Sequence, residues 1–379
     1  MKKRPISSDS HVTEPPDLFA NHIDPAFRDR APFIERREKY GDVYVIPGHP
    51  IPVPMGHIAA AGRDPATVSA WGVSFDDIYR GGWDPKARIE DQERDGLAAE
   101  VIFPTVGMVT CTHPDSEYKR ACFRAYNRWL EGFVGAAPDR LIGVGQLMVD
   151  ADLGRVLRDI EEIRAKGFKG LMLPAEPECW EEHDYDDTYF DPVWEAAAAA
   201  RMPITFHIQT SRQYLNALAA GKVRGSHVRM LSFLQSIRLS QDLIGIFVFG
   251  GVFERHPALK MVSVEADAGW LPHFIHRMDH GYVHHRRWLR GKELQQLPSV
   301  YVNENVYLTF QDDKTAFQFK DQMNLKRMLW ANDFPHTDST WPNSQAVLDR
   351  YTAFMTDSER NAIVHDNTAT LYGLRSMVQ

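Results

Sequence analysis

Four side chains that could bind a divalent metal ion stand in or just after short apolar segments far apart in the chain. They are Asp9 and His11 in segment 6–12, His207 in segment 204–208 and Asp333 in segment 328–336. Imidazole nitrogens and carboxylate oxygens are the ligands of catalytic zinc, which keeps one position free for water or substrate. Asp9 and His11 are two residues apart, so on an extended strand they face the same way. The pattern predicts one metal centre and favours an enzyme.

The prediction depends on the four residues acting together. His207 alone would more simply be a hydrogen-bonded core histidine, because most histidines in apolar strands are structural. An Asp-x-His pair, a second histidine and a further aspartate at one end of a fold would instead leave several buried polar groups unsatisfied without an ion. We therefore interpret Asp9, His11, His207 and Asp333 as ligands of a single ion, zinc before manganese.

Short β-like segments alternate with helix-like ones, which is the pattern of parallel strands joined by crossover helices. Helices are expected at 152–166 and 191–201, and the ambiguous apolar segment 243–249 is interpreted as helix. Eight such units predict a (β/α)8 TIM barrel, whose active sites lie at the C-terminal ends of the strands. The eight predicted strands lie near residues 6–11, 100–105, 142–148, 170–174, 204–208, 260–265, 306–310 and 327–332.

One stretch interrupts the alternation. Residues 29–86 are rich in proline, glycine and aromatic residues and show little helical periodicity. We interpret them as an insertion after the first strand, within a single domain spanning residues 1–379. A cap over the mouth of the barrel is the favoured interpretation, and an oligomer contact or a plain surface excursion are the alternatives.

Composition narrows the class of protein. With 379 residues, 44% hydrophobic and 25% charged, the chain can bury a large core, and its net charge of -8 argues against a nucleic-acid partner. We see neither an apolar signal core nor an apolar run of about 18 residues, so no membrane segment is expected and a cytoplasmic location is predicted. Three irregularly spaced cysteines, Cys111, Cys122 and Cys179, are expected to be unpaired thiols.

The order of these motifs, together with segments Gly250–Glu265 and Asn367–Gly373, resembles the amidohydrolase superfamily. Within it, the chain is similar to the branch of aminocarboxymuconate-semialdehyde, γ-resorcylate and 5-carboxyvanillate decarboxylases. The resemblance covers most of the chain outside the insertion. It implies a metal-dependent decarboxylase of an aromatic or unsaturated carboxylic acid, assembled as a homodimer or higher homo-oligomer. A hydrolase of an ester, amide, lactone or C–C bond and a non-catalytic binding barrel are the alternatives.

Two departures from the family pattern bear on the site. The usual His-x-His opening reads Asp9-Ser-His11 here, and carboxylate still binds zinc or manganese. Glu265 takes the place of the decarboxylases' proton-handling histidine, so it could act as a general acid or base, or simply pair with Arg277. The strand at 170–174 carries no lysine to bridge two metals, since Lys169 precedes it, and a single ion is inferred.

The remaining candidates carry weaker signals. Asp333 or Glu265 is expected to deliver a proton to carbon, and His336 to line the mouth or to support Asp333. Glu14 could orient a ligand or merely hold its loop. The candidate substrate-binding residues are Arg63, Arg80 and Arg277, since guanidinium groups pair bidentately with carboxylates. The histidines of segment 273–285 are expected on a solvated or interface face rather than at a second metal site.

Overall fold

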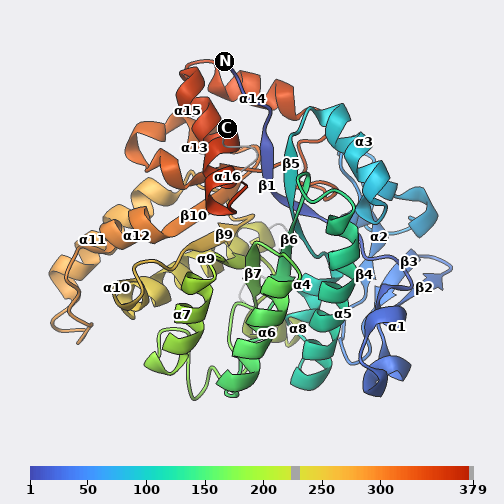
Figure 1. Ribbon diagram of the computed structural model, residues 1–379, viewed down its shortest axis with the longest axis horizontal. Helices are drawn as coiled ribbons and strands as arrows, with labels where there is room; N and C mark the ends of the chain where they lie inside the picture. The colour runs from blue at the N-terminus through green and yellow to red at the C-terminus, as the bar shows by residue number, and fades with distance from the viewer. Residues whose placement is uncertain (223–230, 375–379) are drawn as a thin grey trace.

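Eight parallel strands form the centre of the computed structural model, which describes residues 1–222 and 231–374 (Figure 1). Every strand begins and ends within a few residues of its predicted position. All residues of these strands are buried, as expected for parallel strands covered by helices on the outside. The strands are β1 (Ile6–His11), β5 (Ala99–Phe103), β6 (Leu141–Gln146), β7 (Gly170–Leu173), β8 (Ile204–His207), β9 (Met261–Val264), β10 (Val306–Phe310) and β11 (Met328–Trp330).

The barrel closes between the last strand and the first. β11 and β1 are not paired as a regular ladder, but the backbone N–H of Asp333 donates to the carbonyl of Asp9 at 3.0 Å. The N–H of His11 donates to the carbonyl of Phe334 at 2.6 Å. These two bonds join the strand ends that carry three of the predicted metal ligands. The predicted (β/α)8 barrel is confirmed.

Helices follow the strands and cover the outside of the barrel (Figure 1). The predicted amphipathic helix is α6 (Leu153–Ala165), which buries Val156, Ile160 and Ile163 and is capped by the Asp152 carboxylate. The segment 243–249 is helical, as predicted, within α9 (Leu231–Phe249). The other helices are α3 (Pro85–Asp95), α4 (Val106–Thr110), α5 (Ser116–Gly135), α7 (Asp191–Ala199), α8 (Arg212–Ala219), α10 (Val252–Arg255), α11 (Leu271–His285), α12 (Pro298–Asn305), α13 (Lys314–Gln318), α14 (Ser344–Thr352), α15 (Asp357–Asn361) and α16 (Asn367–Leu371).

The insertion contains regular structure that the sequence did not reveal. A small antiparallel sheet is formed by β2 (Phe33–Arg37), β3 (Gly41–Val45) and β4 (Val53–Pro54). Together with α1 (Leu18–His22) and α2 (Met55–Ile58), it lies along α5 at one flank of the barrel (Figure 1). These strands were missed because β2 is largely exposed and shows no alternation of apolar and polar residues. Side chains packed between this sheet and α5 include Leu18, Phe19, Tyr44, Ile46, Tyr118 and Cys122.

Another part of the insertion contacts the loop that follows β11. The N–H of Ala61 donates to the carbonyl of Pro335 at 3.1 Å, and the hydroxyl of Tyr79 donates to the carbonyl of Ala61 at 2.7 Å. Ala61 also packs in a small apolar cluster with Phe334 and Trp341. The insertion is thereby attached to the segment that carries Asp333. Its role as a cap over a substrate pocket stays a prediction.

The three cysteines are free thiols, with Cys111 and Cys122 buried and Cys179 half-buried. Among the helices formed by residues 1–222 and 231–374, none combines the length and the apolar character needed to cross a bilayer.

Candidate metal centre

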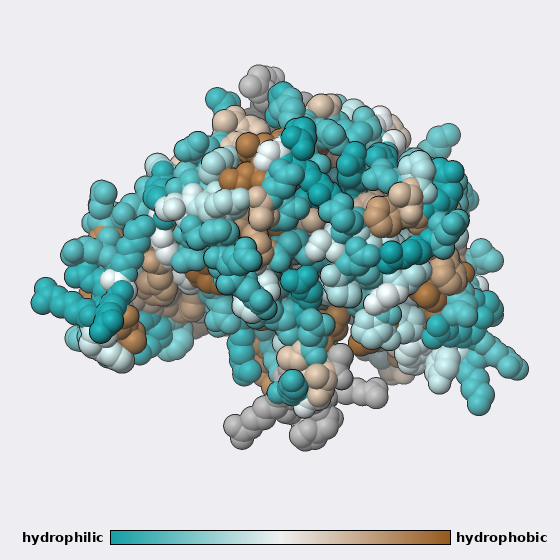
Figure 2. Space-filling view, turned by 90° about the horizontal axis from the view of Figure 1, so that it is seen from below, coloured by the Kyte–Doolittle hydropathy of each residue, from teal (hydrophilic) through white to brown (hydrophobic). Residues whose placement is uncertain are grey.

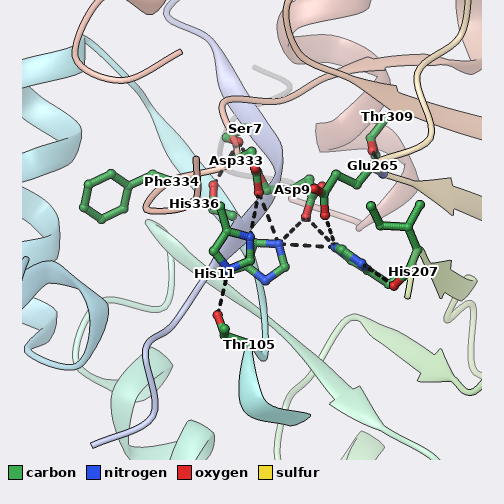
Figure 3. Close-up of polar contacts among 12 residues, drawn as sticks. Ser7, Asp9, His11, Thr105, His207, Glu265, Thr309, Asp333, Phe334 and His336 are labelled. Atoms are coloured by element: carbon green, nitrogen blue, oxygen red, sulfur yellow. Dashed lines mark hydrogen bonds and ion pairs between the residues drawn. The ribbon is translucent and has the colours of Figure 1, made fainter. Parts of the chain in front are cut away.

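The predicted ligands converge at the C-terminal end of the barrel, where β1, β8 and the segments after β9 and β11 meet (Figure 3). Nε2 of His11 lies 3.3 Å from a carboxylate oxygen of Asp9 and 3.3 Å from one of Asp333. Nε2 of His207 lies 3.2 Å from Nε2 of His11 and 3.6 Å from the same Asp9 oxygen. Asp9, His207 and Asp333, which come from three separate segments, therefore all approach Nε2 of His11.

The carboxylates of this cluster lack the partners that buried charges require. Both oxygens of Asp9 and both oxygens of Asp333 are buried, and no hydrogen bond reaches them within the part of the chain that the structure describes. An unpaired buried carboxylate is strongly unfavourable in a low-dielectric interior, so such groups bind a metal ion or change protonation. The arrangement fits a cation held between the two aspartates.

The two histidines present the same ring nitrogen to this point. Nδ1 of His11 lies 2.8 Å from the carbonyl of Pro104, and Nδ1 of His207 lies 3.2 Å from the carbonyl of Ile208. Because a carbonyl only accepts, we assign a ring proton to Nδ1 in both residues, which directs both Nε2 atoms at the same point. Two nitrogens bound to one zinc at about 2.0–2.1 Å would have a similar separation. The carbonyls fix the tautomer in the way that supports metal ligation.

Glu265 joins the cluster from the segment after β9. Its carboxylate lies 3.2 Å from Nε2 of His207, and its backbone N–H donates to the hydroxyl of Thr309 at 2.8 Å. The alternative pairing with Arg277 does not occur, because Arg277 is exposed on α11. The Glu265 side chain is 12% exposed, whereas those of Asp9 and Asp333 are fully enclosed. Glu265 is therefore the most accessible carboxylate of the cluster.

The backbone is strained at the two acidic residues that follow strands. Glu265 has φ of 59° and Asp333 has φ of 53°, in the left-handed region that residues other than glycine rarely adopt. Such conformations persist only where the surrounding structure enforces them, and they concentrate at functional sites.

His336 forms the edge of the cluster. Its ring stacks on that of His11 with centroids 3.9 Å apart, and its Nδ1 lies 3.4 Å from a carboxylate oxygen of Asp333. Its Nε2 lies 2.9 Å from the hydroxyl of Thr105. Both ring nitrogens thus have partners, one of them a ligand candidate. Ligand atoms of His11, Glu265, Asp333 and His336 lie within 4.8 Å of one another, as do those of Asp9, His11, His207 and Glu265.

Burial and neighbouring charges set the protonation of the acids. Burial opposes ionisation of Asp9, but contacts with His207 and His11 outweigh it and lower the pKa of Asp9. The same balance, with His336 and His11 as partners, lowers the pKa of Asp333. Burial raises the pKa of Glu265 well above its usual value, and the nearby charges of Asp333 and Asp9 reinforce the rise. The pKa of Glu265 is thus shifted in the opposite direction from those of Asp9 and Asp333.

This geometry can be compared with known proteins. A family model described as Amidohydrolase matches residues 42–374. The match begins after β1 and includes all the remaining strands of the barrel. The chain belongs to the amidohydrolase family.

Solved structures share the fold of this amidohydrolase. An amidohydrolase from Mycobacterium avium subsp. paratuberculosis K-10 matches with a TM-score of 0.78 and 23% identity, over 98% of this chain and 100% of that one. A 5-carboxyvanillate decarboxylase from Sphingomonas paucimobilis matches with a TM-score of 0.65 and 18% identity, over 98% and 99%. A dihydroxybenzoic acid decarboxylase from Polaromonas sp. JS666, with bound manganese and the inhibitor 2-nitroresorcinol, matches with a TM-score of 0.62 and 17% identity, over 98% of each chain.

The ligand-bearing strand ends of the amidohydrolase are supported by a buried residue that the sequence did not reveal. Arg88, on α3, donates to the carbonyl of His11 at 2.7 Å and to the carboxylate of Glu100 at 2.5 Å. Its guanidinium carbon lies 4.6 Å from the centroid of the Phe334 ring, next to Asp333. Arg88 therefore contacts both sides of the closure between β1 and β11. It was missed because α3 is rich in charged residues, and nothing in the pattern marks Arg88 as buried.

Other candidates lie outside the cluster. Glu14 accepts hydrogen bonds from the N–H groups of Thr105, Val106 and Gly107, so it holds the loop after β5. Arg63 is half-buried within the insertion and donates to the carbonyl of Asp77. Arg80 is 74% exposed and pairs with Asp84. Substrate binding by Arg63, Arg80 and Arg277 stays a prediction.

Proposed function

We propose that this amidohydrolase is a metal-dependent, non-oxidative decarboxylase of an aromatic or unsaturated carboxylic acid. The observation that carries the proposal is a buried centre in which the carboxylate oxygens of Asp9 and Asp333 have no hydrogen bond among the described residues. One oxygen of each aspartate lies 3.3 Å from Nε2 of His11, and the same Asp9 oxygen lies 3.6 Å from Nε2 of His207. Similar structures include decarboxylases of 5-carboxyvanillate and dihydroxybenzoate, one of them with manganese. A substrate with a ring hydroxyl beside its carboxylate would suit such a centre.

Asp9, His11, His207 and Asp333 would hold one divalent ion, with zinc expected and manganese as the alternative. When bound, the ion supplies positive charge that polarises the substrate and stabilises the negative charge left on carbon as the C–C bond breaks. The enclosed aspartates keep their place as anions, and the two Nδ1 contacts to carbonyls keep the histidine rings oriented. The ligand side chains would thus be oriented before the substrate binds.

Glu265 is our candidate donor of the proton that replaces the carboxylate on the substrate carbon. The reaction releases CO2 from the carboxylate, leaves the bonding electron pair on the substrate carbon, and requires one proton there. Glu265 has the only accessible carboxylate among the three acids of the cluster, and it sits beside His207. A carboxyl group at this position can donate its proton to carbon and regain one from solvent. Asp333 is the alternative donor, and His336 is placed to hold Asp333 in position.

The test is a panel of aromatic acids with and without an adjacent hydroxyl group, incubated with the metal-loaded protein in deuterated water. We expect release of carbon dioxide and a product carrying one deuterium at the carbon that lost the carboxylate. Absence of carbon dioxide release across the panel, from protein whose metal content is complete, would contradict the proposal.

Hydrolysis is the second candidate, because the matching family model and two similar structures are described as amidohydrolases. The same ion would then activate water against an ester, amide, lactone or C–C bond. Incubation in 18O-labelled water distinguishes the two reactions, since only hydrolysis places the label in a product acid. A non-catalytic binding barrel predicts instead that the purified protein holds no divalent metal, which elemental analysis measures.

A cation besides the metal ion would strengthen binding of a carboxylate substrate. Arg63, Arg80 and Arg277 are the candidates that we propose, each as a bidentate partner of a carboxylate. If one of them binds substrate, its change to methionine raises KM far more than it lowers kcat, and a change to lysine restores part of the loss. If all three methionine variants keep the KM of the wild type, none of these arginines binds the substrate.

A further inference from the structure

One polar side chain at the mouth of the barrel is enclosed and has no partner. Gln311 follows β10 and is 2% exposed, yet its carboxamide forms no hydrogen bond within the part of the chain that the structure describes, and its Nε2 is fully buried. On the face of the molecule shown in Figure 2, most side chains are hydrophilic and contact solvent, which provides their hydrogen bonds. An enclosed carboxamide lacks that compensation, so its hydrogen bonds are available to a ligand.

Gln311 faces the mouth rather than the outer helices. Phe310, the residue before it, packs on Phe317 of the outer helix α13, with ring centroids 5.2 Å apart. Successive residues of a strand face opposite sides, so Thr309 and Gln311 face the inside of the barrel. The hydroxyl of Thr309 accepts a hydrogen bond from the N–H of Glu265 at 2.8 Å. Gln311 lies one step further along this inner face, toward the end of the barrel that carries the metal centre.

The segment that follows β9 lies beside Gln311. The carboxylate of Asp313 accepts hydrogen bonds from the N–H groups of Ala268 and Gly269 in this segment, at 3.0 and 2.6 Å. The segment is therefore bonded to the chain both before and after Gln311. Asp267, within the segment, has φ of 56°, in the left-handed region that residues other than glycine rarely adopt. Such a conformation persists only where the surrounding fold enforces it, so Asp267 is held at this rim of the mouth.

Acidic side chains gather on this rim without a cation. Asp267 forms no hydrogen bond and no ion pair with any residue that the structure describes. Burial raises the pKa of Asp267 to about 7, and the charges of Asp313, Asp338 and Asp312 add to the rise. These acids would repel the carboxylate of a ligand. A positively charged group would instead be attracted to the rim, and it would offset the repulsion among the acids.

We propose that Gln311 and Asp267 form a subsite for a positively charged nitrogen group of the substrate. This inference rests on the proposed function, because the carboxylate of the same substrate would lie at the ion. Glu265 connects the two regions, since it is two residues from Asp267 and its carboxylate lies 3.2 Å from Nε2 of His207. An ammonium group donates up to three hydrogen bonds, and the Asp267 carboxylate and the Gln311 carboxamide oxygen both accept. The substrate class is therefore an acid that also carries a basic amine.

Matched ligands that differ only in this group test the subsite without requiring turnover. The ligands are meta- and para-(aminomethyl)benzoate, each compared with the corresponding ethylbenzoate, in which a methyl group of similar size replaces the ammonium. Isothermal titration calorimetry measures the Kd of each ligand for the metal-loaded protein. We expect at least one aminomethyl ligand to bind about 10–100-fold more tightly than its ethyl counterpart, the usual effect of a hydrogen bond to a charged group.

Two substitutions assign the effect to the proposed residues. Asp267→Asn and Gln311→Met each remove one partner while conserving size. We expect each variant to bind the aminomethyl ligand about 10-fold more weakly than the wild type and the ethyl ligand equally well. Unchanged binding of the ethyl ligand also shows that the variant is folded and loaded with metal. Gln318→Met, an exposed change on α13, is the matched control and alters neither Kd.

The possible results separate the subsite from the proposed reaction. Equal Kd values within both ligand pairs, no binding of any of the four ligands, or equal weakening of both kinds of ligand in the variants would overturn the subsite. Carbon dioxide release from hydroxylated aromatic acids is measured separately. Release combined with equal Kd values would contradict the subsite and leave the decarboxylase standing. A preference for the ammonium without any release would support the subsite and contradict the decarboxylase.

Discussion

At the scale of single residues, the centre contains carboxylates of two kinds. Asp9 and Asp333 are enclosed and accept no hydrogen bond from the described residues, whereas Glu265 is partly accessible and next to His207. The proposed function assigns the first two to the ion and the third to the proton. Single substitutions separate these roles, because metal content and turnover can be measured independently.

Asp333→Asn removes the charge that faces His11 while conserving shape. We expect loss of bound metal and a fall in kcat/KM of at least about 100-fold, since even groups that only support a ligand cost 10–100-fold when changed. Elemental analysis and steady-state kinetics measure the two effects. Asp349→Asn, an exposed change on α14 that removes only a surface ion pair with Lys2, is the control and retains both metal and activity. A fully active, fully loaded Asp333→Asn protein would remove Asp333 from the centre.

Glu265→Gln keeps a polar side chain but removes the transferable proton. If Glu265 donates to carbon, metal content stays near the wild-type value while kcat falls by about 10²–10⁴-fold, the usual contribution of a general acid. Loss of metal from this variant would show instead that Glu265 is a ligand, which its distance of 3.2 Å from Nε2 of His207 also permits.

At the scale of elements, the ligands depend on how β1 and β11 are held together. The two strands share few backbone hydrogen bonds, and α3 supplies the missing support through Arg88, which contacts His11, Glu100 and Phe334. A second connection runs from Asp95 on α3 to Asn332 and Ser344. The outer helix thus positions the ends of two inner strands.

Arg88→Met breaks a buried ion pair and the contact to the His11 carbonyl. Breaking such a pair costs about 3–5 kcal/mol of stability, and we also expect weaker metal affinity in chelator competition. Arg360→Met is the control, because Arg360 is also buried but donates to the carbonyl of Lys3, away from the ligands. The control should lose stability without losing metal affinity. Equal losses of affinity in both variants would mean that Arg88 has no special role in positioning the ligands.

The Asp95 connection makes stability depend on pH. Burial raises the pKa of Asp95 to about 6, in spite of hydrogen bonds from Ser344 and Asn332. The folded state therefore holds this proton more tightly than the unfolded state, so the free energy of unfolding falls as pH rises from about 4 to above 6, by up to about 3 kcal/mol. Asp95→Asn is expected to remove this part of the pH dependence in urea titrations. An unchanged slope between pH 4 and 7 would contradict the raised pKa.

At the scale of the whole molecule, the ion would join segments from both ends of the chain. Asp9 and His11 come from the first strand, His207 from the middle and Asp333 from just after the last strand. A cation bound only by the folded state stabilises the entire barrel, and it also relieves the repulsion between the enclosed aspartates.

Metal removal should therefore lower thermal stability as well as activity. Extraction with a chelator is expected to lower Tm, and added zinc or manganese to restore it. The stabilisation amounts to about 2.7 kcal/mol when free metal is 100 times its Kd. Calorimetry of the extracted and reloaded protein measures the difference, and magnesium serves as the control because it favours oxygen ligands over imidazole. A Tm independent of zinc and manganese would count against a metal centre.

Much of this arrangement was predictable from the sequence. The eight strands were recognisable as short apolar segments, and Asp9, His11, His207 and Asp333 stood at or just after their ends, where a TIM barrel places its site. That information is local, because a few consecutive residues determine both the burial of a strand and the side chain at its end. The resemblance to known decarboxylases added Glu265 as a residue of interest, but not its partner.

Only the tertiary structure decided which distant groups meet. It placed Glu265 against His207 rather than Arg277, brought Arg88 from a helix of charged residues to the carbonyl of His11, and formed a sheet from the irregular insertion. These contacts join residues far apart in the chain, and their energies depend on burial and distance, which no local pattern of residue types records.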